Sequence, residues 1–222
     1  MINAIIYFAN RIRNLGKIKL FKLLYLLDFE HFRQTGRSVT GLEYYAWKLG
    51  PVPVALDQEW EEPEPDMAQA VAIEPEKVID YVRVKIIARA EFDDSHFSKR
   101  ELRIMADLVE QYRDELSHRM IDVTHAENGA WARVWNNGRG LNRPIDYELC
   151  LAENDPHRAA ILEFAGDHQA LVQTARVAGA RLRGEALRDD AEDTPPLTNA
   201  QLLAVRQRAP KRKGLVLSTL LK

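Results

Sequence analysis

The segment from Ile18 to Phe32 constrains the fold of this 222-residue chain most, because apolar residues fill nearly every side of the helix it would form. These residues are Leu20, Phe21, Leu23, Leu24, Tyr25, Leu26, Leu27, Phe29 and Phe32. A surface helix keeps a polar face, whereas a helix that is apolar on most sides is buried. We therefore predict a buried helix that ends at Gly36, a residue that readily stops a helix.

Helical periodicity returns in several later parts of the chain. Apolar spacing and helix-end signals predict helices over 2–14, 54–60, 98–117 and 157–183, and another from Thr124 to a stop at Gly138. The period changes to two between Lys77 and Arg89, which predicts one strand, and residues 144–151 have an extended pattern. The expected fold class is mainly α with a small β element (α+β).

Two short motifs predict helix starts. Ser98 is followed three residues later by Glu101, so that the hydroxyl and the carboxylate can reciprocally satisfy free amides in a capping box. The segment that begins at Thr124 repeats this spacing, and we expect His125 to pack beside Trp131. These residues are interpreted as structural.

Aromatic residues and a rigid backbone are concentrated just after the buried helix. Tyr44, Tyr45 and Trp47 precede the segment Gly50-Pro51-Val52-Pro53, whose glycine and prolines favour a fixed corner. Aromatic side chains dominate binding hot spots, so Tyr44 and Tyr45 are candidate partner contacts. Trp47 is explained equally well by packing under the corner.

Charge is arranged in blocks that the net charge of -2 conceals. Residues 57–66 carry acidic side chains and no basic one, whereas residues 194–222 carry basic side chains and no acidic one. This balance argues against a wholly basic nucleic-acid binder. Each block has two interpretations, a solvated segment or a contact surface: a basic partner for the acidic block and phosphate for the basic one. The candidate residues are Asp57, Glu59, Glu61 and Glu62 in the first block and Lys211, Arg212 and Lys213 in the second.

Candidates for reactive chemistry are few. Asp28, Glu30 and His31 suggest a metal or acid–base site, but only Asp28 and His31 share a helix face, and no HExxH pattern accompanies them. We interpret all three as solvent-facing or salt-bridged. Cys150 is the only cysteine, which excludes an intrachain disulfide and a cysteine-based zinc site, and its apolar neighbours should raise its pKa. We expect no catalytic residue, metal or cofactor, and a non-enzymatic protein.

The N-terminal residues lack the continuous apolar core and cleavage site of a signal peptide. No apolar run approaches the ~20 residues that span a bilayer. We expect a cytoplasmic protein with no membrane association.

Four motifs, taken in order, resemble the Panacea domain, also called the SocA-like antitoxin domain. They are Leu23-Leu24-Tyr25, the stretch Ala46-Trp47-Lys48-Leu49-Gly50-Pro51-Val52, the cap from Phe97-Ser98 to Leu102, and Thr124-His125 with Trp131. The ordered set covers about residues 1–151. The resemblance implies a mainly helical domain that serves as the antitoxin of toxin–antitoxin pairs, often phage-related, with no enzymatic activity.

The function that the resemblance implies is neutralisation of a cognate protein toxin, encoded by the adjacent gene, through direct protein–protein contact. One alternative is a DNA-binding transcriptional regulator, with a helix-turn-helix-like N-terminus and the basic tail gripping phosphate. Another alternative is an adaptor that delivers its partner to a cytosolic protease. The oligomeric state stays open.

The expected domain organisation has three parts. Residues 1–152 form the Panacea domain, 153–184 a C-terminal helical extension, and 185–222 an acidic linker with a basic, partly disordered tail. Because the extension lies outside the resemblance, it is a candidate for partner specificity.

Overall fold

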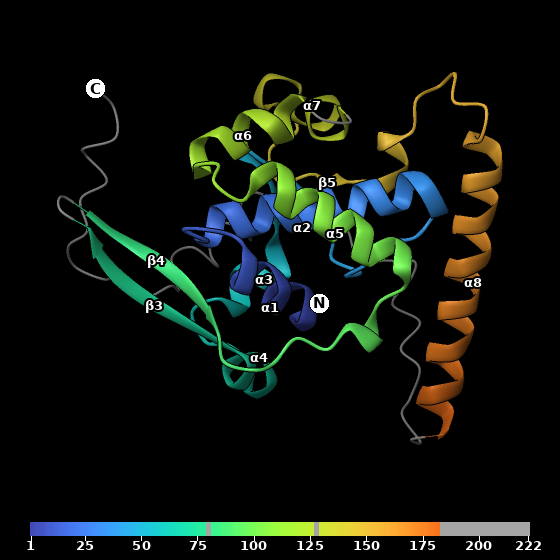
Figure 1. Ribbon diagram of the computed structural model, residues 1–222. Coiled ribbons are helices and arrows are strands. Elements are labelled where there is room, and N and C mark those ends of the chain that lie inside the picture. The colour runs from blue at the N-terminus through green and yellow to red at the C-terminus, as the bar shows by residue number, and fades with distance from the viewer. Residues whose placement is uncertain (79–80, 127–128, 183–222) are drawn as a thin grey trace, which may run out of the picture. The chain divides into compact units, whose positions relative to one another are not determined.

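A computed structural model describes residues 1–78, 81–126 and 129–182 of the chain (Figure 1). The helices are α1 (Ile2–Arg11), α2 (Lys17–Thr35), α3 (Val54–Glu59), α4 (Pro65–Ala70), α5 (Lys99–Tyr112), α6 (Ser117–Ala126), α7 (Ala130–Trp135) and α8 (Arg158–Leu182), with 3-10 turns η1 (Asp94–His96), η2 (Asn136–Gly138) and η3 (Tyr147–Cys150). The strands are β1 (Tyr44–Trp47), β2 (Gly50–Pro53), β3 (Val71–Val78), β4 (Tyr81–Ala88) and β5 (Pro144–Ile145). The predicted fold class, mainly α with a small β element, is confirmed.

The chain divides into two compact units, residues 1–172 and 173–222. All the packing described below belongs to the first unit. Residues 183–222, which include the predicted basic tail, lie outside the described part of the chain.

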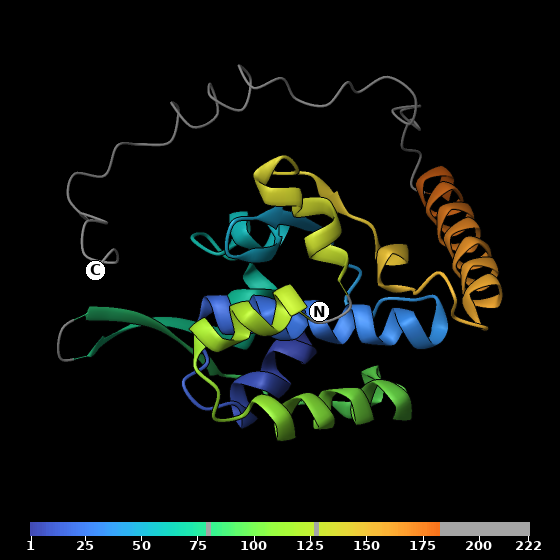
Figure 2. The same ribbon diagram turned by 90° about the horizontal axis from the view of Figure 1, so that it is seen from above.

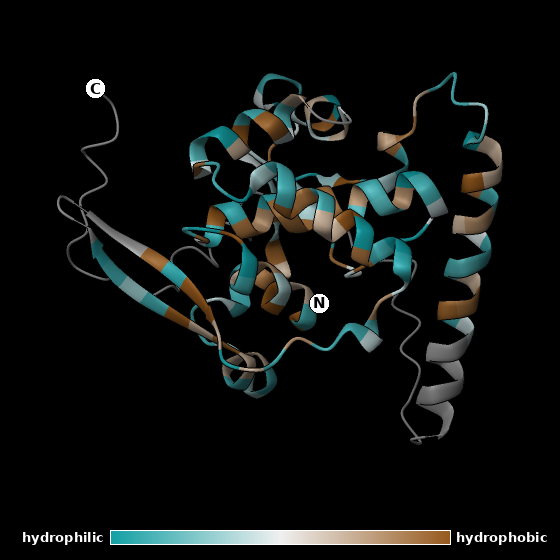
Figure 3. Cartoon of the chain, viewed as in Figure 1, coloured by the Kyte–Doolittle hydropathy of each residue, from teal (hydrophilic) through white to brown (hydrophobic). Residues whose placement is uncertain are grey.

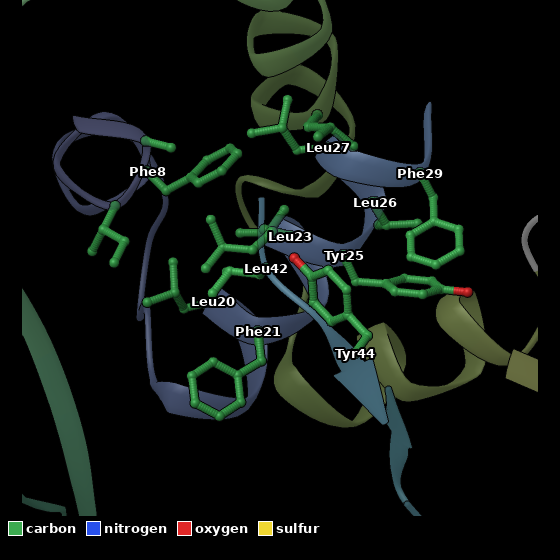
Figure 4. Close-up of a cluster of buried hydrophobic side chains, with 14 of the residues drawn as sticks. Phe8, Leu20, Phe21, Leu23, Tyr25, Leu26, Leu27, Phe29, Leu42 and Tyr44 are labelled. Carbon is green, nitrogen blue, oxygen red and sulfur yellow. The ribbon is translucent and has the colours of Figure 1, made fainter. Parts of the chain in front are cut away.

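Helix α2 is the centre of the first unit. The apolar residues from Leu20 to Phe29 are buried, as the apolar pattern predicts. Lys19, Lys22 and Asp28 are buried with them, which the pattern did not predict. Helices α5 and α6, strand β2 and turn η3 all pack on α2, and Figure 2 shows α5 running alongside it. Figure 4 shows side chains of α2 meeting Phe8 of α1 and Tyr44 of β1 in one cluster. Figure 3 colours each residue by its hydropathy, and it shows apolar residues along α2 and hydrophilic residues on much of α5.

Two predicted helix ends are confirmed by their backbone geometry. Helix α2 ends at Gly36 in the left-handed conformation, with φ of 73°. Helix α5 begins with the predicted capping box: the Glu101 amide donates to Ser98 Oγ (3.3 Å) and the Ser98 amide donates to Glu101 Oε2 (2.6 Å). Local hydrogen-bonding chemistry is therefore sufficient to define these ends.

Three predicted elements are corrected by the structure. The single helix over 98–117 is two helices, because the chain leaves α5 after Tyr112 and starts α6 at Ser117. Thr124 does not open a helix but lies in the last turn of α6, and α7 begins after Gly129, whose φ is 72°. The predicted strand is β4, and it pairs antiparallel with β3, which the sequence did not suggest because Pro75 and its acidic neighbours hide the alternation.

The three-stranded sheet has the order β2-β1-β5. Strands β1 and β2 form a tight hairpin in which Trp47 faces Gly50, and β5 adds Ile145 and Pro144 opposite Tyr44 and Tyr45. The extended pattern over 144–151 is therefore only a two-residue strand, followed by turn η3. The sheet joins the corner at residue 50 to a segment almost 100 residues later.

Gly36 also allows the start of α8 to approach the end of α2. A Cβ atom at position 36 would lie 2.6 Å from the carbonyl oxygen of Ile161 and 3.0 Å from the amide nitrogen of Ala165. Both atoms belong to the backbone, so a side chain at this position would displace one of the two helices. The side chain of Ile161 is itself buried.

Candidate functional site

Several residues that carry the family resemblance meet at the hairpin corner between β1 and β2. The Nζ atom of Lys22, on α2, donates a 2.8 Å hydrogen bond to the carbonyl oxygen of Pro51. Gly50 has φ of 105°, and a Cβ atom there would lie 2.7 Å from Lys22 Nζ and 3.1 Å from Thr124 Oγ1. The corner therefore needs glycine for two reasons, the backbone conformation and the space that the lysine and the threonine occupy.

Lys22 is a charged residue in the core. Its side chain is 2% exposed, and burial lowers the pKa of its ammonium group from 10.5 to about 7. Desolvation disfavours the charged form of a lysine, and the carbonyl of Pro51 compensates only part of that cost. The sequence analysis missed Lys22, although a lysine inside a helix that is apolar all round could have signalled a buried charge.

Thr124 and His125 bring α6 to the same corner. The buried hydroxyl of Thr124 donates to the carbonyl oxygens of Met120 and Ile121, each at 3.1 Å, so its role is inside the helix rather than at a helix start. The predicted packing of His125 beside Trp131 is confirmed: the rings stack with centroids 3.6 Å apart and planes 1° apart.

Trp131 links this stack back to the hairpin, because its Nε1 donates a 3.0 Å hydrogen bond to the carbonyl oxygen of Trp47. Burial, and then the positive charge of Lys22, lowers the pKa of His125. The buried Nε2 atom of His125 has no hydrogen-bond partner in the described part of the chain. These contacts lock α2, the corner, α6 and α7 into one unit, which we call the corner framework: Lys22, Trp47, Gly50, Pro51, Thr124, His125 and Trp131.

The other residues of the resemblance divide into core residues, a helix cap and the exposed Lys48 and Leu49 of the corner. Leu23, Leu24, Tyr25 and Val52 are buried in the core. Ser98 and Glu101 cap α5, as described above.

Asp28 corrects one interpretation drawn from the sequence. It is fully buried, not solvent-facing, and its Oδ1 accepts hydrogen bonds from the amides of Val39 (2.8 Å) and Thr40 (2.7 Å). Its Oδ2 accepts from the hydroxyls of Tyr44 (2.7 Å) and Thr40. Burial raises the pKa of Asp28, and the four donors oppose that shift.

Tyr44 is accordingly a core residue. Its side chain is 1% exposed and its hydroxyl is engaged by Asp28, so it presents no surface to a partner. Residues that alternate along a strand point to opposite faces, which leaves Tyr45 as the aromatic residue of this pair that reaches solvent.

His31 and Glu30 are the other two residues of α2 that the sequence suggested for a metal or acid–base site. His31 is buried, with Nδ1 2.8 Å from the carbonyl oxygen of Arg37 and Nε2 3.8 Å from Glu101 Oε1. Glu30 forms the predicted kind of surface salt bridge, 2.7 Å from Arg33. No group of three His, Cys, Asp or Glu residues in the described ranges is arranged to hold a metal ion.

Cys150 is buried, and its thiol donates to the carbonyl oxygen of Phe29 at 3.6 Å. Burial raises the pKa of this thiol to about 12, in the direction that the sequence predicted. A thiol with such a pKa is a poor nucleophile near neutral pH.

The candidate partner-contact residues other than Tyr44 lie outside the corner framework, and some of them already have hydrogen-bond or ion-pair partners within the chain. Tyr45 is half-buried, and its hydroxyl donates to Glu43 at 3.3 Å. Asp57 forms a 2.7 Å ion pair with Lys17, and Glu59 accepts a weak hydrogen bond from the amide of Glu64. In the same block, Glu61 and Glu62 are exposed and make no ion pair with any described residue. Lys211, Arg212 and Lys213 lie outside the described residues.

A second buried lysine, which the sequence analysis also missed, joins α5 to the start of α2. Lys19 Nζ donates to the carbonyl oxygens of Arg13 (3.1 Å), Arg113 (3.1 Å) and Glu115 (2.6 Å). Carbonyl groups at the end of a helix lack partners within the helix, and Lys19 satisfies those that follow α5.

Comparison with known proteins finds a matching family. Residues 20–132 match the family model described as antitoxin SocA-like, Panacea domain. No curated protein and no solved structure matches the chain. Among the described residues, no helix combines the length and the apolar character needed to cross a membrane. The matched range contains every residue of the corner framework, and the chain belongs to the SocA-like antitoxin family that carries the Panacea domain.

Proposed function

We propose that this protein is a cytoplasmic, non-enzymatic antitoxin that binds and neutralises a cognate protein toxin, encoded by the adjacent gene, through direct protein–protein contact. The observation that carries the proposal is the family match over residues 20–132, in a chain where resemblance residues such as Leu23, Tyr25 and Val52 are buried in the core. A framework built from the interior leaves the surface free to differ between family members. Partner recognition then depends on exposed residues outside the corner framework.

The proposed contact surface combines Tyr45, Glu61 and Glu62. Tyr45 offers a partly exposed aromatic ring, the residue type most often found at binding hot spots. Glu61 and Glu62 offer carboxylates that no described residue pairs, so they suit a toxin with a basic contact face. Asp57 and Glu59 have partners within the chain and are weaker candidates.

The C-terminal extension is the second proposed contact element. We divide the chain into a Panacea domain over 1–152, an extension over 153–184 and a tail over 185–222. Phe164, Leu171 and Val172 of α8 are each more than half exposed, which is unusual for large apolar side chains on a free surface. A toxin that covers them would explain their exposure.

Coexpression tests the proposal directly. The adjacent reading frame is expressed from an inducible promoter with and without this protein, and colony growth is counted. We expect the neighbour to arrest growth alone and to be harmless in the presence of this protein. A neighbour that is harmless alone, or that stays toxic, contradicts the proposal.

The contact surface is tested with charge reversal. The double variant Glu61→Lys/Glu62→Lys should weaken neutralisation and slow toxin association in surface plasmon resonance, because the basic face of the toxin would be repelled. The matched control is Asp107→Lys/Glu110→Lys, which reverses two exposed acids on α5. Equal effects of both double variants would exclude a specific acidic contact.

The DNA-binding alternative receives less support from the described residues. A recognition helix must present polar side chains to the groove, but α2 is buried from Lys19 to Phe29. That alternative therefore depends on the basic tail. A mobility shift with the protein's own promoter DNA, lost on deletion of residues 210–222, is the result that would favour it.

A further inference from the structure

A cavity of about 580 Å³ with three arginines on its wall lies beside α7 and β5. Arg133 comes from α7, Arg139 follows turn η2, and Arg143 immediately precedes β5. The three side chains are exposed and form no ion pair or hydrogen bond with any described residue. All three follow residue 132, where the match to the family ends. The cavity is therefore a feature of this chain beyond the shared framework.

The backbone beneath two of these arginines is held firmly in place. A Cβ atom at Gly140 would lie 1.7 Å from the carbonyl oxygen of Val134, so the loop that carries Arg139 presses against α7 in a way that only glycine allows. Arg143 is anchored to β1, because its carbonyl oxygen accepts a 2.9 Å hydrogen bond from the amide of Ala46. Fixed attachment points reduce the conformational entropy that these side chains lose on binding a ligand.

The charge of the cavity points to the chemistry of its ligand. No acidic residue lines it, so three arginines share the lining of one space without a carboxylate among the lining residues. Guanidinium forks pair with both carboxylates and phosphates in a bidentate manner. A phosphate or pyrophosphate group concentrates more than one negative charge in a small volume, whereas a carboxylate carries a single charge, so phosphate matches three arginines better.

We propose that this cavity binds a small organic phosphate, with Arg133, Arg139 and Arg143 holding the phosphate groups. The wall also includes the apolar side chains of Val134 and Leu149, which suit the organic part of such a ligand. The volume lies in the range of about 300–1,000 Å³ that is common for small-molecule sites. This binding activity goes beyond the proposed neutralisation of a toxin and does not depend on it.

Isothermal titration calorimetry of the full chain at low salt tests the site, with ADP and inorganic pyrophosphate as probes and adenosine as the uncharged control. We expect both phosphate probes to bind and adenosine not to bind. Arg139→Gln should weaken ADP binding about tenfold, the effect of one lost charge-assisted hydrogen bond pair. The matched control is Arg103→Gln, an exposed arginine on α5, which should leave the affinity unchanged.

Three results would overturn the proposal. The first is that neither ADP nor pyrophosphate binds the folded protein. The second is that Arg103→Gln weakens binding as much as Arg139→Gln, which would make the effect one of net charge. The third is that a single-stranded oligodeoxythymidine binds through these arginines and is not displaced by ADP, which would assign them to a nucleic-acid backbone. Thermal unfolding followed by circular dichroism checks that each variant is folded.

Discussion

The Nζ atom of Lys22 lies 2.8 Å from the carbonyl oxygen of Pro51, inside the core around α2. Burial lowers the pKa of this lysine to about 7, while an unfolded chain restores it to its ordinary value of 10.5. Between these two pH values the unfolded state holds a proton that the folded state lacks. The contribution of Lys22 to the free energy of unfolding therefore rises with pH across this window, by at most about 1.4 kcal/mol per pH unit.

Replacing this lysine should remove that pH dependence. In Lys22→Met, we expect the stability of the variant relative to the wild type to fall steadily as the pH increases from about 7 to about 10. Urea unfolding at several pH values measures the difference, in which the titration of groups that Lys22 does not influence cancels. The exposed Lys48→Met is the control and should give a constant difference. A constant difference for Lys22→Met as well would contradict the lowered pKa.

The buried carboxylate of Asp28 should give a graded series of variants. Asp28→Ala leaves two amides and two hydroxyls without an acceptor, and we expect a loss of about 3 kcal/mol or more in the free energy of unfolding. Asp28→Asn should cost less, because its amide oxygen can still accept from Val39 and Thr40 while the hydroxyls turn to accept. Chemical denaturation measures both, and Glu30→Ala on the exposed side should change stability by about 0.5 kcal/mol or less. Equal losses for Asp28→Asn and Asp28→Ala would show that the two backbone donors contribute nothing.

Gly36 should prove essential to the attachment of α8. Gly36→Ala places a methyl group against the backbone of Ile161 and adds strain at a φ of 73°, so we expect a loss of at least ~1 kcal/mol. Hydrogen exchange over residues 158–172 should become faster. Gly166→Ala is the matched control: a Cβ atom there meets nothing within 4 Å, and the variant should gain about 0.5–1 kcal/mol from helix propensity. Unchanged exchange in Gly36→Ala would mean that this close approach does not hold the helix.

Trp131 should be more sensitive to substitution than its neighbour Trp135. Trp131→Phe removes the indole donor that satisfies the carbonyl of Trp47, which should cost about 1–2 kcal/mol. Trp135→Phe removes no indole hydrogen bond with a described residue and should cost less. Thermal unfolding of the two variants compares them. A larger loss for Trp135→Phe would argue against the indole link in the corner framework.

Features determined by neighbouring residues could be predicted from the sequence. The buried helix follows from the apolar residues between Leu20 and Phe32, and the start of α5 follows from Ser98 and Glu101, whose interactions span only a few residues. The same local logic failed at Thr124, because a threonine followed three residues later by an acid can also lie in the last turn of a helix. A local sequence pattern can therefore indicate a helix start, but tertiary packing determines whether the residue lies at the start or at the end of a helix.

The polar centres could not be predicted, because their partners are distant in sequence. Asp28 was placed at the surface, yet its buried environment is created by Thr40 and Tyr44, which approach only when the chain returns after α2. Lys22 depends in the same way on Pro51, and Lys19 on Glu115. Nor does any local pattern bring Arg133, Arg139 and Arg143 to one cavity, since turn η2 and the contact of Gly140 with α7 determine that arrangement.

Strand β5 has a practical consequence for anyone who expresses this domain. It covers one edge of β1 with Pro144 and Ile145, although the recognisable family sequence stops at residue 132. A fragment cut at that point would leave the Ala46 amide, which donates to the Arg143 carbonyl, and the Ala46 carbonyl, which accepts from the Asn142 amide, without these partners. Open strand edges recruit other chains. Truncation at the family boundary should thus give an aggregating product, whereas a fragment that extends past Leu151 keeps the sheet closed.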